Sequence, residues 1–174
     1  GKIVDFEDMH FYLNGKKYTL GNTTIQEMID DGVPFDNKQL SEDPTKLAKN
    51  SYSESEIKVR LDDSWLIDLF VMNTSDSAKQ IKDCVVYKID VQRIEKHKVN
   101  SDILRFEFPW NITNGELVAN AGQGKVTNST VKDGSYDEYS YQQVKTDFKE
   151  FKFGFINGEL SSVCITCIPK MNQN

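Results

Sequence analysis

The side chains best suited to acid–base or nucleophilic chemistry are few and widely separated in this sequence. Its two histidines, His10 and His97, lie in separate polar segments. The sequence has no His-x-His, His-Glu-x-x-His or Gly-x-Ser-x-Gly motif and no glycine-rich phosphate loop. A general base must lie within hydrogen-bond reach of the proton that it removes, and no spacing here predicts that for either histidine. We therefore expect surface histidines, no catalytic residue, no cofactor and a protein that is not an enzyme.

The three cysteines include one redox-like spacing, between Cys164 and Cys167. Redox Cys-x-x-Cys motifs sit at a helix N-terminus, whereas this pair lies in a run of Val, Ile and Thr that favours a strand. In a strand, positions i and i+3 lie about 10 Å apart on opposite faces, beyond the reach of a disulfide. An odd number of cysteines also fits neither a disulfide framework nor a four-ligand zinc site. We expect Cys84, Cys164 and Cys167 to be unpaired and largely buried.

Neighbouring carboxylates are the remaining candidates for metal binding. Asp62 and Asp63, together with Asn73, offer oxygen atoms of the kind that calcium prefers. These carboxylates occur where turns are expected, however, and carboxylates at turns are normally solvated. The sequence therefore predicts no metal site.

The net charge of the protein indicates which class of partner it can bind, and its N-terminal sequence bears on its cellular location. The net charge of −6 and the isoelectric point near 5.0 argue against nucleic acid, which needs a basic surface. No apolar run approaches the ~18 residues of a membrane span, and no signal peptide is visible. The sequence starts at Gly1 without methionine, through removal of a leader or through an artificial boundary. We expect an extracytoplasmic bacterial protein, secreted or anchored at the cell surface by an N-terminal lipid that this sequence lacks.

Four Asn-x-Ser/Thr triplets bear on the same question. They begin at Asn22, Asn73, Asn111 and Asn128. Such triplets would suit a eukaryotic secreted glycoprotein, whereas in a bacterium they carry little meaning.

A pattern that occurs twice along the chain predicts the architecture. A helical signature at 24–29 ends at Gly32 and precedes three strand-like runs, and a second at 113–118 ends at Gly122 and precedes three more. The offset between them is about half the chain, which indicates a tandem. The predicted fold class is α+β, with two tandem units that each pack a short helical segment on an antiparallel sheet. Residues 1–98 and 99–174 would form the halves of one compact body.

Turn signals and alternating apolar residues locate the expected strands. Asn14-Gly15 predicts a hairpin over 11–20, and runs at 57–61, 65–71, 81–91, 136–141, 151–155 and 160–168 alternate as strands do. Residues 36–52 and 126–135 show no sustained period and are predicted as loops. The strand pattern at 103–108 fits either the first sheet or the start of the second half.

The last hairpin predicts an irregularity. A regular turn at Asn157-Gly158 would set residues 160, 162 and 164 opposite the phenylalanines at 155, 153 and 151. Val163 and Ile165 are the bulkier apolar residues, however, and they would then face away from the rings. Because a shift of one residue exchanges the two faces of a strand, we predict a one-residue bulge after Leu160.

The second half carries a pattern similar to that of a known family. Thr113, Glu116, Val118 and Gly122 match its helical part, and a tyrosine strand, Phe-x-Phe-x-Phe, Asn-Gly-x-Leu and a Val/Ile strand follow over 112–168. This resembles the small lipoproteins of the SmpA/OmlA type and, as a tandem, the β-lactamase inhibitor protein fold. It covers about a third of the chain, and Gln123 stands where the family commonly has proline. The resemblance implies a helical segment packed on one face of an antiparallel sheet, and it implies no chemistry.

A binding role needs an aromatic surface that a partner can reach. One face of a single sheet with helices on its other face must be solvated, covered or used. Tyrosine and tryptophan are favoured at recognition surfaces, although most such rings pack in cores. The candidate binding surface comprises Trp65, Trp110, Tyr136, Tyr139 and Tyr141.

We therefore predict a non-catalytic, extracytoplasmic module that binds another protein at the cell envelope. The alternatives are an inhibitor-like regulator of a secreted hydrolase and a hydrolase. A contiguous exposed aromatic patch would favour binding, and a deep polar cleft holding His10 or His97 would favour an enzyme.

Overall fold

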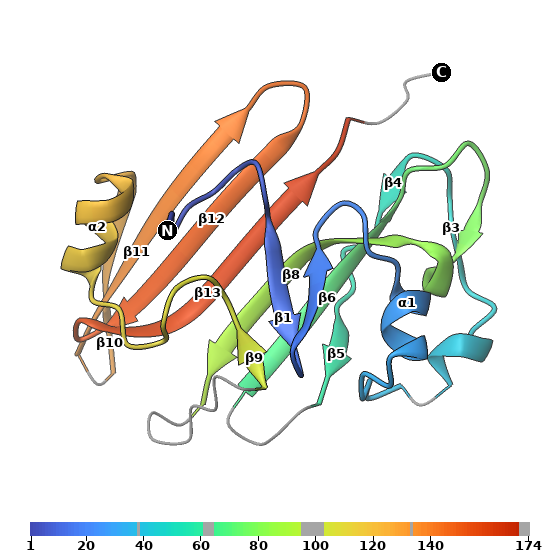
Figure 1. Ribbon diagram of the computed structural model, residues 1–174, viewed down its shortest axis with the longest axis horizontal. Coiled ribbons are helices and arrows are strands. Elements are labelled where there is room, and N and C mark those ends of the chain that lie inside the picture. Colours follow the sequence, from blue (N-terminus) through green and yellow to red (C-terminus); the bar gives the residue numbers. More distant parts are fainter. Residues whose placement is uncertain (38, 61–64, 95–102, 133, 171–174) are drawn as a thin grey trace.

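A single large antiparallel sheet makes up most of the protein (Figure 1). The computed structural model describes residues 1–37, 39–60, 65–94, 103–132 and 134–170. Within them the strand order of this sheet is β10-β11-β12-β13-β8-β6-β4, and β5 pairs with β6 as well. Its strands are β4 (Ser51–Tyr52), β5 (Ile57–Val59), β6 (Trp65–Asn73), β8 (Val85–Arg93), β10 (Lys125–Val131), β11 (Gly134–Val144), β12 (Phe148–Ile156) and β13 (Glu159–Ile168).

Smaller elements cover parts of this sheet. A second sheet has the order β2-β1-β9, and a third consists of β3 and β7. Figure 1 shows α1 and α2 near opposite ends of the molecule. The strands are β1 (His10–Leu13), β2 (Lys16–Thr19), β3 (Lys46–Leu47), β7 (Lys79–Gln80) and β9 (Leu104–Arg105), and the helices are α1 (Ile25–Asp30), α2 (Asn114–Ala121) and the 3₁₀ turns η1 (Leu40–Glu42) and η2 (Ile81–Asp83).

Local sequence explains the two tight hairpins. Asn14 and Gly15 join β1 to β2 with φ values of 49° and 81°, and Asn157 and Gly158 join β12 to β13 with 50° and 80°. A two-residue hairpin turn of this type needs positive φ at both positions, which Asn-Gly adopts at little cost. Both turns lie where the sequence predicts them.

Both α-helices begin at a threonine that caps them. The Thr24 hydroxyl accepts a hydrogen bond from the Glu27 amide in α1, and Thr113 accepts one from Glu116 in α2. In α2 the Glu116 carboxylate also accepts from the Thr113 amide, which completes a capping box. The predicted helices at both positions are thus confirmed.

The core lies between the large sheet and the β2-β1-β9 sheet. Phe153 and Phe155 of β12 are fully buried, as is Phe11 of β1. Phe108, from the segment after β9, meets the edge of Phe153 with ring centroids 5.3 Å apart. Aromatic rings therefore supply much of the buried area, as the composition suggests.

The predicted fold class is wrong. The protein is mostly β, and β13 pairs with β8, so strands from both halves of the chain share one curled antiparallel sheet. Two tandem units, each with a helix on its own sheet, do not exist within the described residues. The predicted boundary at residues 98 and 99 lies outside them.

Helix length explains the error. The six residues of α1 span about 9 Å, whereas the nine-residue strands β6 and β8 span about 30 Å. A helix this short cannot cover such a sheet. The β1–β2 hairpin and β9 cover the middle of the large sheet instead (Figure 1). Because β9 pairs with β1, the 103–108 run joins strands of the first half and does not open a second sheet.

Two further predictions have opposite outcomes. The register between β12 and β13 shifts next to Gly154 and Phe155, which leaves Ser161 unpaired and sets Val163 opposite Phe153. The predicted bulge is confirmed. The predicted loop at 126–135 is wrong, because β10 occupies most of it. Its Thr, Asn and Ser residues lack apolar alternation because the strand is an exposed edge.

Candidate functional site

The structure separates the five aromatic residues predicted as a binding surface. Trp65 and Trp110 pack against each other with ring centroids 4.3 Å apart, and both are buried. Tyr139 and Tyr141 are buried as well, and the Tyr141 hydroxyl donates to the Gly122 carbonyl. Tyr136 alone is half-buried, and it points to the other face of the sheet. The five rings do not form one surface.

Strand register defines the face of the large sheet opposite the core, which we call the open face. Its residues alternate with the buried ones along each strand, and most are exposed or half-buried. Three rows cross it: Leu66, Gln92, Ser162, Gly154 and Glu138; then Lys58, Asp68, Asp90, Cys164, Lys152 and Ser140; then Phe70, Lys88, Thr166, Glu150 and Gln142. The open face is therefore largely polar, with charges of both signs.

Asp90 lies in the middle row, directly opposite Asp68 on β6. Burial raises the pKa of Asp90, the charges of Lys88 and Lys152 partly offset this, and the charges of Asp68 and Glu138 raise the pKa further. Asp68 is itself 3.4 Å from the Lys58 ammonium. Like charges directly opposite each other destabilise a sheet. The open face thus holds a partly desolvated carboxylate that an external cation would stabilise.

An aromatic cluster of Tyr52, Phe70 and Tyr87 lies at the end of the third row. The Tyr87 ring centroid is 5.9 Å from that of Tyr52 and 6.3 Å from that of Phe70. Lys88 Nζ lies 4.7 Å from the centre of the Phe70 ring. Tyr52 is 49% exposed. Phe70 is half-buried and Tyr87 is buried, so the cluster offers a partner a small aromatic surface, from residues other than the predicted ones.

Close packing orders the polar groups around Gly154. The Tyr136 hydroxyl donates a 3.0 Å hydrogen bond to Glu138 Oε2. A Cβ atom at Gly154 would overlap both that hydroxyl and Ser162 Oγ. Only glycine leaves room for these two side chains to cross the strand.

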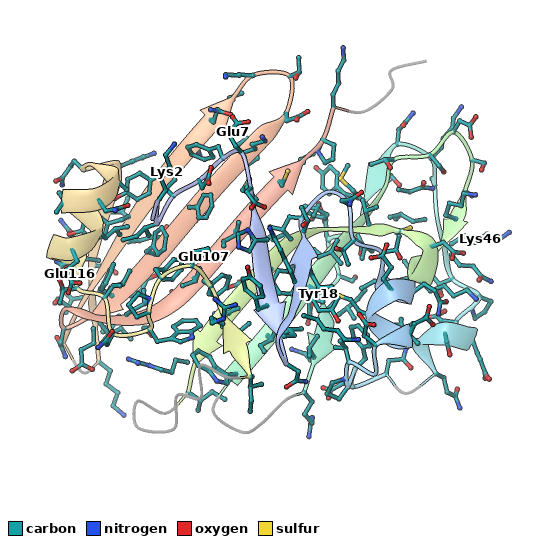
Figure 2. The ribbon with its side chains drawn as sticks, viewed as in Figure 1. Lys2, Glu7, Tyr18, Lys46, Glu107 and Glu116 are labelled. Atoms are coloured by element: carbon teal, nitrogen blue, oxygen red, sulfur yellow. The ribbon has the colours of Figure 1, made fainter. Side chains whose placement is uncertain are left out.

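The His10 ring is engaged on both nitrogens. Nδ1 lies 2.9 Å from the Asp8 carbonyl oxygen, and Nε2 lies 2.8 Å from Glu107 Oε1. Both ring nitrogens thus have a partner within the protein, and neither is left free to face a substrate. Figure 2 shows Glu107 in the segment after β9, beside β1. The His10 side chain is 7% exposed, which contradicts the predicted surface position, and the arrangement does not suit a general base.

A hollow of about 240 Å³ lies beside His10, lined in part by Asp5, Phe106 and Phe151. No serine, threonine or cysteine is among its lining residues. His97, Asp62 and Asp63 lie outside the described residues, so the structure does not place them. Within the described residues no group of three or more His, Cys, Asp or Glu is arranged to hold a metal ion.

A larger pocket of about 440 Å³ lies between η1, β5 and η2. Leu40, Leu47, Ile57 and Ile81 line it together with a larger number of polar and charged residues. Two of its charged lining residues have ion-pair partners, since Asp36 pairs with Arg60 and Lys58 pairs with Asp68. Figure 2 shows Lys46 at the outer end of β3. No histidine or cysteine is among the residues that line this pocket.

The cysteines are free, as predicted. Cys84 and Cys167 are buried, and Cys164 is half-buried on the open face. Burial raises the pKa of Cys84 and of Cys164 to about 11. Thiols in this state are poor nucleophiles at neutral pH.

Asp68 and Asp90 are not among the site residues predicted from the sequence. A signal for Asp68 exists, because it is a carboxylate within the mostly apolar run at 65–73, whereas Asp90 lies in a run at 85–93 that also holds Lys88, Gln92 and Arg93. The period of two places each carboxylate on the side of its own strand that faces away from the alternating apolar residues. Their pairing opposite each other requires the strand register, which the sequence does not reveal.

We compared the chain with known protein families, proteins and structures. No family model, curated protein or solved structure matches this chain. The resemblance to small lipoproteins thus stays a prediction. Among the described residues, no helix is long and apolar enough to span a membrane.

Proposed function

We propose that this protein is a non-catalytic binding module whose open face engages a basic segment of a protein partner. Asp90 carries the proposal: it is half-buried, its pKa is raised by burial, and Asp68 lies directly opposite. A desolvated carboxylate beside a second carboxylate lowers the stability of the free protein, and groups with perturbed pKa values cluster at functional sites. A lysine or arginine from the partner would offset it.

The aromatic cluster supports the same proposal. Phe70 follows Asp68 by two residues on β6, so their side chains lie on one face roughly 7 Å apart. A partner segment with a basic residue next to an apolar one would contact both. Aromatic residues at a recognition surface supply large contact areas at low entropic cost.

The bacterial cell envelope is the location that we propose for this partner. The acidic net charge and the lipoprotein-like sequence pattern support it. An acidic module would also associate faster with a basic partner, and this steering would weaken with added salt.

Site-specific photocrosslinking tests the proposal. A benzophenone amino acid replaces Gln92, which is exposed on the open face, or Ala119, which is exposed on α2. After irradiation in an envelope fraction of the source organism, we expect a discrete adduct from position 92 and none from position 119. Equal adducts from both positions, or none from position 92, would contradict the proposal.

A further inference from the structure

The strand β10 ends the large sheet, and none of the other described strands pairs with its outer edge. It pairs with β11 over seven residues without a register shift, and five of the seven are exposed. Natural proteins protect edges by shortness, bulges, proline or charge. β10 has only Lys125, at its first position, whereas β4 and β5 at the other end of the sheet are two and three residues long. The edge of β10 is thus the unprotected one among the described strands.

Backbone geometry identifies which residues face this edge. The Ser135 carbonyl accepts a hydrogen bond from the Asn157 amide, so it points away from β10. Ser135 is opposite Thr130, which makes this a pair without mutual hydrogen bonds. Such pairs alternate along an antiparallel ladder, so Val126 and Asn128 belong to the same class. The amides and carbonyls of Val126, Asn128 and Thr130 therefore point outward from the sheet.

The same strand is complementary to itself. In an antiparallel pair of two copies centred on Asn128, Val126 lies opposite Thr130 and Thr127 lies opposite Ser129. Lys125 lies opposite Val131, so no like charges meet. All three outward-facing residues then fall into hydrogen-bonded pairs, and the hydroxyls of Thr127 and Ser129 can bond across the strands.

We propose that a second copy of this chain binds at this edge. The two β10 strands pair antiparallel about a two-fold axis through Asn128, so that the large sheets of two chains become continuous. An isologous interface of this kind closes with two subunits and leaves no free edge at β10. The open face of each copy stays accessible, which makes this inference independent of the proposed function.

Proline at position 128 tests the pairing. Asn128→Pro removes an amide that points outward and is not used by β11, so the fold should persist. We expect sedimentation velocity to give a dimer of the 19.9 kDa chain for the parent and for Asn128→Thr. The dissociation constant should rise at least about tenfold in Asn128→Pro, with unchanged circular dichroism. A parent that is monomeric at all concentrations, or a folded Asn128→Pro variant with unchanged association, would overturn the proposal.

A disulfide test covers the case in which the proline variant does not fold. Opposite residues in a hydrogen-bonded antiparallel pair have Cα atoms about 5.5 Å apart, within disulfide reach. Asn128→Cys should therefore form a disulfide-linked dimer under mild oxidation. Ser129→Cys should not, since position 129 faces position 127 of the other copy. Equal linking of both variants would refute the register and the two-fold axis.

Discussion

His10 Nε2 lies 2.8 Å from Glu107 Oε1, which joins two residues 97 positions apart in the sequence. Tyr12 donates to the same carboxylate oxygen, and Lys17 pairs with Asp8 on the other side of the ring. The cluster ties β1 to the segment that follows β9 and carries Phe108 into the core.

Removing the His10 ring should weaken the attachment of β1 to the segment after β9. We expect His10→Ala to lower the free energy of unfolding by about 1.5–3 kcal/mol, because hydrogen bonds to charged groups are lost from a nearly buried side chain. Urea unfolding measures the change. Val144→Ala, at a position that is 66% exposed, is the control and should stay within about 0.5 kcal/mol of the parent.

Acid should weaken the same cluster. The hydrogen bond from Lys17 lowers the pKa of Asp8, and the one from His10 lowers the pKa of Glu107. A carboxylate with a lowered folded pKa stabilises the fold above its unfolded pKa, and this stabilisation is lost as the pH falls through the folded value. The melting temperature of the parent should thus fall below about pH 4. It should fall less steeply in Glu107→Gln, which lacks one of the two carboxylates. Identical profiles for the two proteins would contradict this.

A side chain at position 154 should lower the stability of the fold. Gly154→Ala places a Cβ atom against Ser162 Oγ and the Tyr136 hydroxyl, and overpacking of this kind costs about 1–3 kcal/mol. Adding Ser162→Gly should recover part of the loss. A double-mutant cycle by chemical denaturation measures the coupling, and strictly additive effects would argue against this contact.

Native thiol reactivity should be low. Burial raises the pKa of Cys84, Cys164 and Cys167, so few thiolates exist at neutral pH. With a colorimetric disulfide reagent we expect slow reaction of the native protein and rapid reaction of all three thiols after denaturation. Rapid native reaction of two or more thiols would refute the buried positions.

Local signals in the sequence predicted local structure well. Asn14-Gly15 and Asn157-Gly158 marked their hairpins because positive φ is a property of the turn residues themselves. The bulge at Ser161 followed from the need to bury Val163 against Phe153. Each of these depends on residues close together in the chain.

Long-range pairing could not be predicted in the same way. That β13 pairs with β8, and β9 with β1, depends on which strands meet in space, and alternating patterns are alike for many partners. The apparent repeat therefore suggested two sheets where one exists. Asp90 escaped notice because its significance comes from Asp68 opposite it, which only the register reveals.

The substitution Asp90→Asn tests the proposed binding role of the open face most directly. The raised pKa means that the ionised carboxylate costs stability above the unfolded pKa, so the substitution should raise the melting temperature at neutral pH. It should also reduce the yield of the crosslinked adduct from position 92 at least about tenfold, because a partner's cation loses its counter-charge. An unchanged adduct yield would contradict the account, as would an adduct lost together with a lowered melting temperature.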